Sequence, residues 1–169
     1  MVNKAIRRRS SRSSKEKISC RKIIQKQIKK VKATKKGLTS ETINQLTKYA
    51  PNFIGCFSED VLLTLVFHQK PCFLIVNLDK TGMPGSHWIA LGLFDDKIEV
   101  FDFLGFKIFN WPRIPCNLLS FLHQHSTRRN LVISPLLQRN NKLCGVYCIY
   151  YVLNRPFMSF SEICNKIDF

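Results

Sequence analysis

The sequence lacks long apolar runs, because no uncharged stretch approaches the roughly 18 residues of a membrane-spanning helix. No apolar segment of the signal-peptide type follows the arginines near the N-terminus. The seven cysteines are an odd number and include no C-x-x-C pair, and His123 and His125 have no cysteine pair at zinc-ligand spacing. We therefore expect no metal site and no transmembrane segment, and we expect free thiols in an intracellular, reducing compartment.

Acidic residues are scarce in the first part of the chain. Residues 1–36 contain fifteen of the 27 lysines and arginines and one acidic residue, so they carry +14 of the net charge of +16. This stretch has too much like charge to fold alone, and we predict a basic tail that is disordered or becomes helical on binding. Ile24, Ile28 and Val31 recur at i, i+4 and i+7, which would place them on one face of such a helix.

Nucleic acid is the predicted partner of this tail, because clustered lysines and arginines neutralise phosphates and release counterions. A membrane surface, a nuclear import signal or a merely solvated leader are the alternatives. The candidate DNA-binding residues are Arg7, Arg8, Arg9, Arg12, Lys29 and Lys30.

Residues 37–169 are expected to form one domain, because their net charge is +2 and the chain is 45% apolar. Helices are predicted at 38–50, 58–67, 116–124, 144–154 and after Ser159, and the β-branched residues of 58–67 leave a strand possible there. Strands are predicted at 72–78, 87–94, 97–104 and 130–137. This order of elements predicts an α+β fold with a small central sheet flanked by helices.

Cys144 lies at the boundary between the polar loop 139–143 and the apolar run 144–154. A structural cysteine is expected inside such a run, whereas the first position of a helix offers free backbone N–H groups. A cysteine nucleophile reacts as a thiolate, which a helix start favours, and it needs a histidine to accept its proton. We therefore predict that Cys144 is a nucleophile and that Cys148, one helical turn further, belongs to the core.

Among the four histidines, His87 is the candidate partner of Cys144. It stands where a Gly/Pro loop enters a predicted strand, and Trp88 follows it. The other three lie toward the ends of predicted helices and are expected at the surface: His68, His123 and His125.

The predicted hairpin indicates which carboxylate would orient His87. A two-residue turn at 95–96 fixes a register that makes Asp102 a diagonal neighbour of His87, roughly 7 to 8 Å away at the backbone. Glu99 falls on the opposite face because side chains alternate along a strand. We therefore predict that Asp102 orients His87 and that Glu99 is dispensable for turnover.

Gln138 is the candidate oxyanion donor. It follows the predicted strand 130–137 and precedes Cys144 by six residues, so the intervening loop could fold its amide back beside the thiol. Acyl transfer requires donors aimed at the developing oxyanion. We expect the Gln138 side chain and the Cys144 backbone N–H to supply them.

The "HW" pair, the "VFDFLGF" stretch and the pattern Q-x5-CG resemble those of the adenovirus-type cysteine endopeptidases and the related SUMO-deconjugating cysteine proteases. The likeness spans roughly residues 52–154, and "NFIGCFSEDVL" is similar to a segment of adenovirus-like proteases of viruses and Polinton-type transposons. The resemblance implies a papain-like, adenain-like fold. It assigns the roles of general base, orienting acid, nucleophile, oxyanion donor and site-shaping aromatic residue to His87, Asp102, Cys144, Gln138 and Trp88, respectively.

The resemblance also implies a function, which is cleavage of viral precursor polypeptides by a monomeric enzyme in the host nucleus or the virion. DNA is the expected activator, whereas no residue of the chain argues for an activating viral peptide. The compact domain favours a viral enzyme over a cellular deconjugase. A SUMO- or ubiquitin-type deconjugating isopeptidase and a degenerate protease that serves as a basic nucleic-acid-binding virion protein remain the alternatives.

Overall fold

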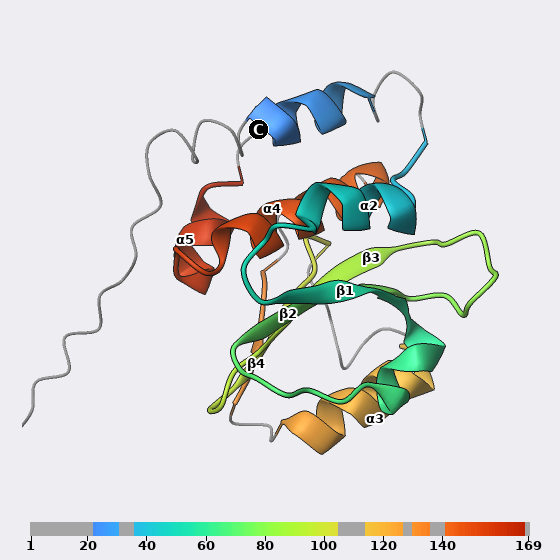
Figure 1. Cartoon of the computed structure of the whole chain (residues 1–169), viewed down its shortest axis with the longest axis vertical. Helices are drawn as coiled ribbons and strands as arrows, with labels where there is room; N and C mark the ends of the chain where they lie inside the picture. The colour runs from blue at the N-terminus through green and yellow to red at the C-terminus, as the bar shows by residue number, and fades with distance from the viewer. Residues whose placement is uncertain (1–21, 31–35, 105–113, 127–129, 136–140, 168–169) are drawn as a thin grey trace, which may run out of the picture.

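The computed structural model describes residues 22–30, 36–104, 114–126, 130–135 and 141–167 (Figure 1). A five-stranded mixed sheet lies at its centre, with the strands in the order β1-β2-β3-β4-β5. Helices flank the sheet, so the predicted α+β class is confirmed. The strands are β1 (Phe53–Ser58), β2 (Cys72–Asn77), β3 (Trp88–Leu93), β4 (Ile98–Phe101) and β5 (Leu131–Ile133). The helices are α2 (Ser40–Thr47), α3 (Cys116–His125), α4 (Cys144–Asn154) and α5 (Phe160–Asn165), with 3-10 turns η1 (Glu59–Thr64) and η2 (Asn141–Leu143).

The hairpin β3–β4 has the register that the sequence predicted. Leu93 pairs with Ile98, and the Phe94 N–H donates to the Lys97 carbonyl at 2.9 Å across the turn. The pairs β1–β2 and β4–β5 are parallel, whereas β2–β3 is antiparallel like the hairpin. The hairpin thus occupies the middle of the sheet, where it can bring residues at its open end together.

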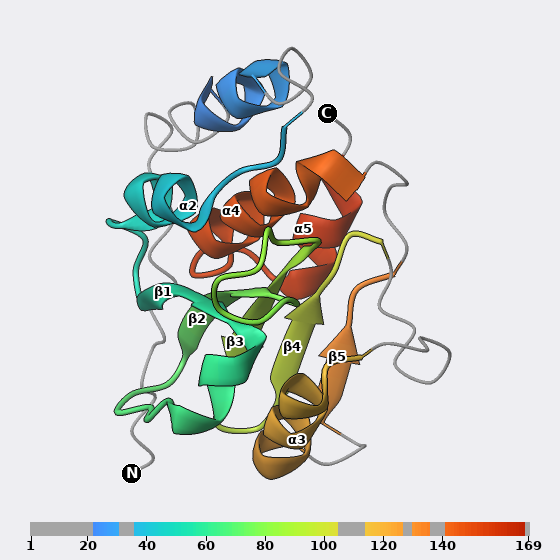
Figure 2. The same cartoon turned by 90° about the vertical axis from the view of Figure 1, so that its right-hand side faces the viewer.

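Two hydrophobic clusters cover the two faces of the sheet, as alternation along the strands requires. On one side lie α2, α4 and α5, and on the other lie η1 and α3 (Figure 2). All eleven residues of α4 are buried, which confirms the prediction of a wholly apolar, buried helix. None of the helices in the described ranges is long and apolar enough to cross a bilayer.

Part of the segment that we assigned to the tail packs against the domain. Residues 22–30 form a helix, drawn in blue in Figure 1, in which Ile24 is 0% and Ile28 is 6% exposed. Both side chains belong to the cluster that contains α4, whereas Lys22, Lys26 and Lys29 are exposed. The i, i+4 spacing of the isoleucines is therefore used for docking on the domain itself.

Two expectations were wrong in the region before β2. The strand β1 was not predicted, and the predicted helix 58–67 is only the 3-10 turn η1, after which Leu65 is extended. Leu62 is buried while Leu63 and Val66 are exposed, so the apolar residues after Ser58 do not share one helical face. The helices α2 and α5 begin at capping side chains: Thr39 accepts from the Thr42 N–H, and Ser159 forms a capping box with Glu162.

Candidate active site

His87 and Asp102 meet at the open end of the β3–β4 hairpin. The His87 Nε2 lies 2.8 Å from Asp102 Oδ1, and both residues are buried, with exposures of 6% and 0%. Asp102 also accepts a bond from the Leu104 N–H at 3.0 Å. The geometry is that of a carboxylate fixing one nitrogen of an imidazole.

Ser134 holds Asp102 in place, and sequence reasoning missed it. The Ser134 Oγ accepts from the Asp102 N–H at 2.9 Å and donates to the Asp102 carbonyl at 2.6 Å, and Ser134 is 3% exposed. The Ser134 N–H donates to the Val100 carbonyl at 3.0 Å, which extends the β4–β5 ladder by one step. The sequence does place Ser134 within a predicted strand. Its contact with Asp102, however, depends on the parallel pairing of β4 with β5, which the sequence does not reveal.

Cys144 is the first residue of α4, as predicted, and it is 4% exposed. The helix has no side-chain cap at Leu143, so the N–H groups of its first turn are not taken by a capping side chain. A Cβ on Gly145 would lie 3.3 Å from atoms of each of Leu38, Ile43 and Trp88. Glycine after the cysteine therefore allows the start of α4 to approach its neighbours closely.

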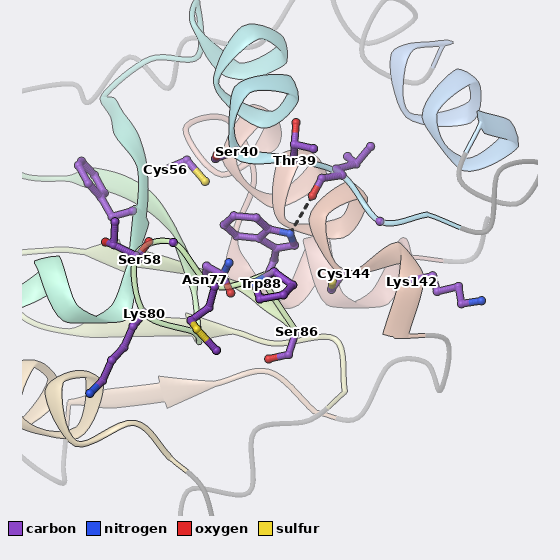
Figure 3. Close-up of a pocket in the computed structure, with 18 residues that line it drawn as sticks. Thr39, Ser40, Cys56, Ser58, Asn77, Lys80, Ser86, Trp88, Lys142 and Cys144 are labelled. Carbon is purple, nitrogen blue, oxygen red and sulfur yellow. Dashed lines mark hydrogen bonds between the residues drawn. The ribbon is translucent and has the colours of Figure 1, made fainter.

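Trp88 forms part of the wall beside Cys144. Its indole Nε1 donates to the Leu38 carbonyl at 3.1 Å, and its side chain is 8% exposed (Figure 3). This bond links β3 to the segment that precedes α2. The indole is thus held rigidly at the position where the resemblance implied a site-shaping aromatic residue.

The electrostatics of His87 connect it to both neighbours. Burial by itself would lower the pKa of His87, but hydrogen bonds with Asp102 and Cys144 and the negative charges of these groups raise it to about 9. The structure therefore brings together His87, Asp102 and Cys144, the three residues predicted from the sequence. The environment of His87 therefore favours the imidazolium form at neutral pH.

The other cysteines differ from Cys144 in their surroundings. Burial raises the pKa of Cys56 to about 12 and that of Cys164 to about 11. Burial also raises the pKa values of Cys72 and Cys148, and Cys148 is 1% exposed within the core. These four side chains remain thiols at neutral pH.

A pocket of about 520 Å³ opens beside Cys144 (Figure 3). Its walls come from the segment 37–40, the end of β1, the loop 80–86, Trp88 and Lys142. The loop is fixed at both ends. The Thr81 N–H and hydroxyl donate to Asp60 Oδ1 at 3.0 and 3.1 Å, and Gly85, with a φ of 82°, packs against the Asn77 amide, where a Cβ would come within 2.7 Å.

Glu99 lies on the α4 side of the sheet and is fully buried. Arg155 Nε and Lys97 Nζ lie 2.6 and 3.0 Å from its carboxylate oxygens, and the Tyr151 hydroxyl donates to it at 2.9 Å. Burial would raise the pKa of Glu99, but Arg155, Lys97 and Tyr151 outweigh it and lower the pKa. Glu99 thus anchors α4 to the sheet.

Several candidate residues lie outside the described residues. They are Gln138, Arg7, Arg8, Arg9 and Arg12. Lys29 and Lys30 are described, and both are exposed on the helix at 22–30. Within the described ranges, no three His, Cys, Asp or Glu side chains lie together as a metal ion would require.

Comparison with known proteins adds no family to this description. No model of a known protein family matches the chain, and a search of curated proteins finds no significant match.

Proposed function

We propose that this chain is a cysteine endopeptidase of the papain-like, adenain-like type. The observation that carries the proposal is that the buried His87 imidazole bonds to the Asp102 carboxylate at 2.8 Å while Cys144 lies close enough to help raise the His87 pKa. Nucleophile, base and orienting acid in this arrangement define the chemistry of cysteine proteases. Two further features support the proposal. Cys144 lies at a helix start without a side-chain cap, and the adjoining pocket offers a site for the substrate.

In the proposed mechanism each of these groups has a role. Asp102 bonds to Nε2, so Nδ1 is the nitrogen that exchanges a proton with Cys144. The thiolate attacks the peptide carbonyl carbon, and the resulting oxyanion accepts from the Cys144 backbone N–H and, we propose, from the Gln138 amide. His87 then gives its proton to the leaving amine as the C–N bond breaks. Water, deprotonated by His87, attacks the thioester and releases the acid and the thiolate.

Viral precursor polypeptides are the proposed substrates, and the host nucleus or the virion is the proposed place of action. The basic segment supports association with nucleic acid, which could also activate the enzyme, and a monomer suffices because the described domain supplies all three residues of the site. A deconjugating isopeptidase would use the same three residues. A degenerate, binding-only protein is disfavoured, since a dead site has no need to keep a 2.8 Å His87–Asp102 bond.

The test measures both substrate cleavage and the reactivity of Cys144. The protein is incubated with co-expressed capsid precursors from its own genome and, in parallel, with SUMO and ubiquitin fusions. Cleavage that disappears in Cys144→Ser and persists in Cys116→Ser, a variant of an exposed cysteine, supports the proposal. An alkylating reagent should label Cys144 ahead of the other six cysteines near neutral pH, and His87→Ala should remove this preference. Labelling of Cys116 at the higher rate, with no cleavage of any substrate, would overturn the proposal.

A further inference from the structure

The charge of the pocket beside Cys144 carries an inference that rests on the proposed function. Two charged side chains line this pocket in the described part of the chain, Lys80 and Lys142, and both are positive. No aspartate or glutamate is among its described lining residues. The remaining lining consists of uncharged polar residues, apolar side chains and glycines.

The two lysines flank the nucleophile. Lys80 begins the loop that follows β2, and Lys142 lies in η2, two residues before Cys144. Figure 3 shows them on opposite sides of Cys144, with both ammonium groups directed away from it. A chain that crosses Cys144 would therefore pass a positive charge before and after the reacting bond, and not at the bond itself.

Two carboxylates near this lining accept hydrogen bonds. Asp60 accepts from the Thr81 N–H and hydroxyl, and Glu41 accepts from the Ser40 hydroxyl at 3.2 Å. Asp60, Glu41 and the neighbouring Glu59 and Asp79 are not among the described residues that line the pocket, where the charged side chains are the two lysines. Opposite charges across a contact surface select partners and disfavour like-charged ones.

We propose that the pocket selects polypeptide segments that carry acidic side chains a few residues from the scissile bond, on both sides of it. Both lysines are exposed, so each acidic contact should raise kcat/KM by up to about fivefold at low salt. The gain should fall as salt screens it. The same preference excludes the chain's own segment 1–36, which carries +14, from its active site.

The experiment uses three fluorogenic peptides of one sequence that differ only in flanking residues, which are glutamate, glutamine or lysine. Wild-type protein is compared with Lys80→Glu and Lys142→Glu. Lys48→Glu is the matched control, since Lys48 stacks over Tyr49 outside the pocket and the net charge changes equally. The quantity compared is the ratio of kcat/KM for the acidic peptide to that for the basic peptide, which cancels any general loss of activity.

The acidic peptide should be cleaved fastest by the wild type, and the ratio should fall at least threefold in each pocket variant and stay constant in Lys48→Glu. Equal cleavage of all three peptides, or the same change in all three variants, would overturn the preference while leaving the protease proposal intact. If no peptide is cleaved but Cys144 is still labelled selectively, the peptides are replaced by precursor proteins. Their cleavage sites carry either acidic flanking residues or the corresponding amides, and the ratio of the two cleavage rates is compared among the same variants. Failure of both cleavage and selective labelling contradicts the proposed function instead.

Discussion

At the scale of single residues, Asp102 and Glu99 show how two buried carboxylates on one strand and its extension serve different purposes. Asp102 bonds to His87, whereas Glu99 is surrounded by Arg155, Lys97 and Tyr151 on the α4 side of the sheet. The expectation that Glu99 is dispensable concerns turnover only. Its burial and ion pairs give it a structural role that the alternation rule could not reveal.

Replacement of each carboxylate by its amide separates the two roles. Asp102→Asn should lower kcat by on the order of 10²- to 10⁴-fold with little change in melting temperature, because the imidazole loses its orienting charge. Glu99→Gln should lower the free energy of unfolding by about 3 kcal/mol, because Arg155 and Lys97 lose a buried partner. Turnover by its folded fraction should be close to that of the wild type. Equal losses of turnover in the two variants would mean that Glu99 also acts on the site.

The two hydrogen bonds between the Ser134 hydroxyl and the Asp102 backbone predict that removal of this hydroxyl lowers turnover, although Ser134 would not contact the substrate. Ser134→Ala leaves the backbone N–H and carbonyl of Asp102 without their partner, so His87 should be held less firmly, and kcat should fall about tenfold while KM stays constant. Ser134→Thr keeps the hydroxyl and should restore kcat. Ser126→Ala, which removes a bond of 2.6 Å to the Leu122 carbonyl on α3, serves as control and should leave kcat unchanged.

The raised pKa of His87 predicts the alkaline limit of activity. The imidazolium must donate a proton to the leaving amine, so kcat/KM should fall as the pH rises through about 9. The folded pKa lies above the unfolded value near 6.5, so protonation of His87 stabilises the fold fully below that pH. This contribution is lost between pH 6.5 and about 9. Asp102→Asn should move the alkaline limit to lower pH, and an unchanged limit would show that another group titrates there.

At the scale of elements, the sequence predicted the helices and strands in which the apolar pattern is clear and a turn or polar loop marks the boundary. The hairpin β3–β4 follows from one short turn and two apolar stretches, and α4 follows from eleven apolar residues after a polar loop. The strand β1 could not be predicted, because Gly55 interrupts six residues at the sheet edge and shifts the register there. Ser134 could not be found either, because its partner depends on which strands pair in parallel.

The helix at 22–30 packs against the domain through Ile24 and Ile28. Ile24→Ala and Ile28→Ala should each lower the free energy of unfolding by about 2 kcal/mol, because each removes a buried side chain from the α4 cluster. Lys26→Ala, on the exposed side of the same helix, should leave the melting temperature unchanged. Thermal unfolding followed by circular dichroism measures the three shifts. Three equal, negligible shifts would show that the helix is not docked in solution.

At the scale of the whole molecule, most of the positive charge and the candidate active site lie in different parts of the chain. If about six basic side chains of residues 1–36 meet phosphates, the logarithm of DNA affinity should fall with the logarithm of salt concentration with a slope of roughly −5. DNA sequence should hardly matter, since such contacts are made to the backbone. Fluorescence anisotropy with labelled duplexes across a salt series measures the slope.

Truncations locate the binding residues without damaging the core. A chain that begins at Lys22 keeps the docked helix but loses eight basic residues, so its slope should be about half that of the full chain. A chain that begins at Gly37 also loses Ile24 and Ile28, so its stability must be measured beside its affinity. Undiminished affinity of the shorter, still folded chain would move the DNA site to residues 37–169. Salt-insensitive binding to anionic vesicles would favour a membrane surface.

Trp88 gives the molecule a built-in optical reporter. The chain contains two tryptophans, and the indole of Trp88 lines the pocket beside Cys144 while its N–H is held by the Leu38 carbonyl. Removal of the second emitter by Trp111→Phe leaves one fluorophore at the site itself. Its emission wavelength follows the polarity around the indole, so arrival of a peptide could be timed in a stopped-flow instrument separately from bond cleavage.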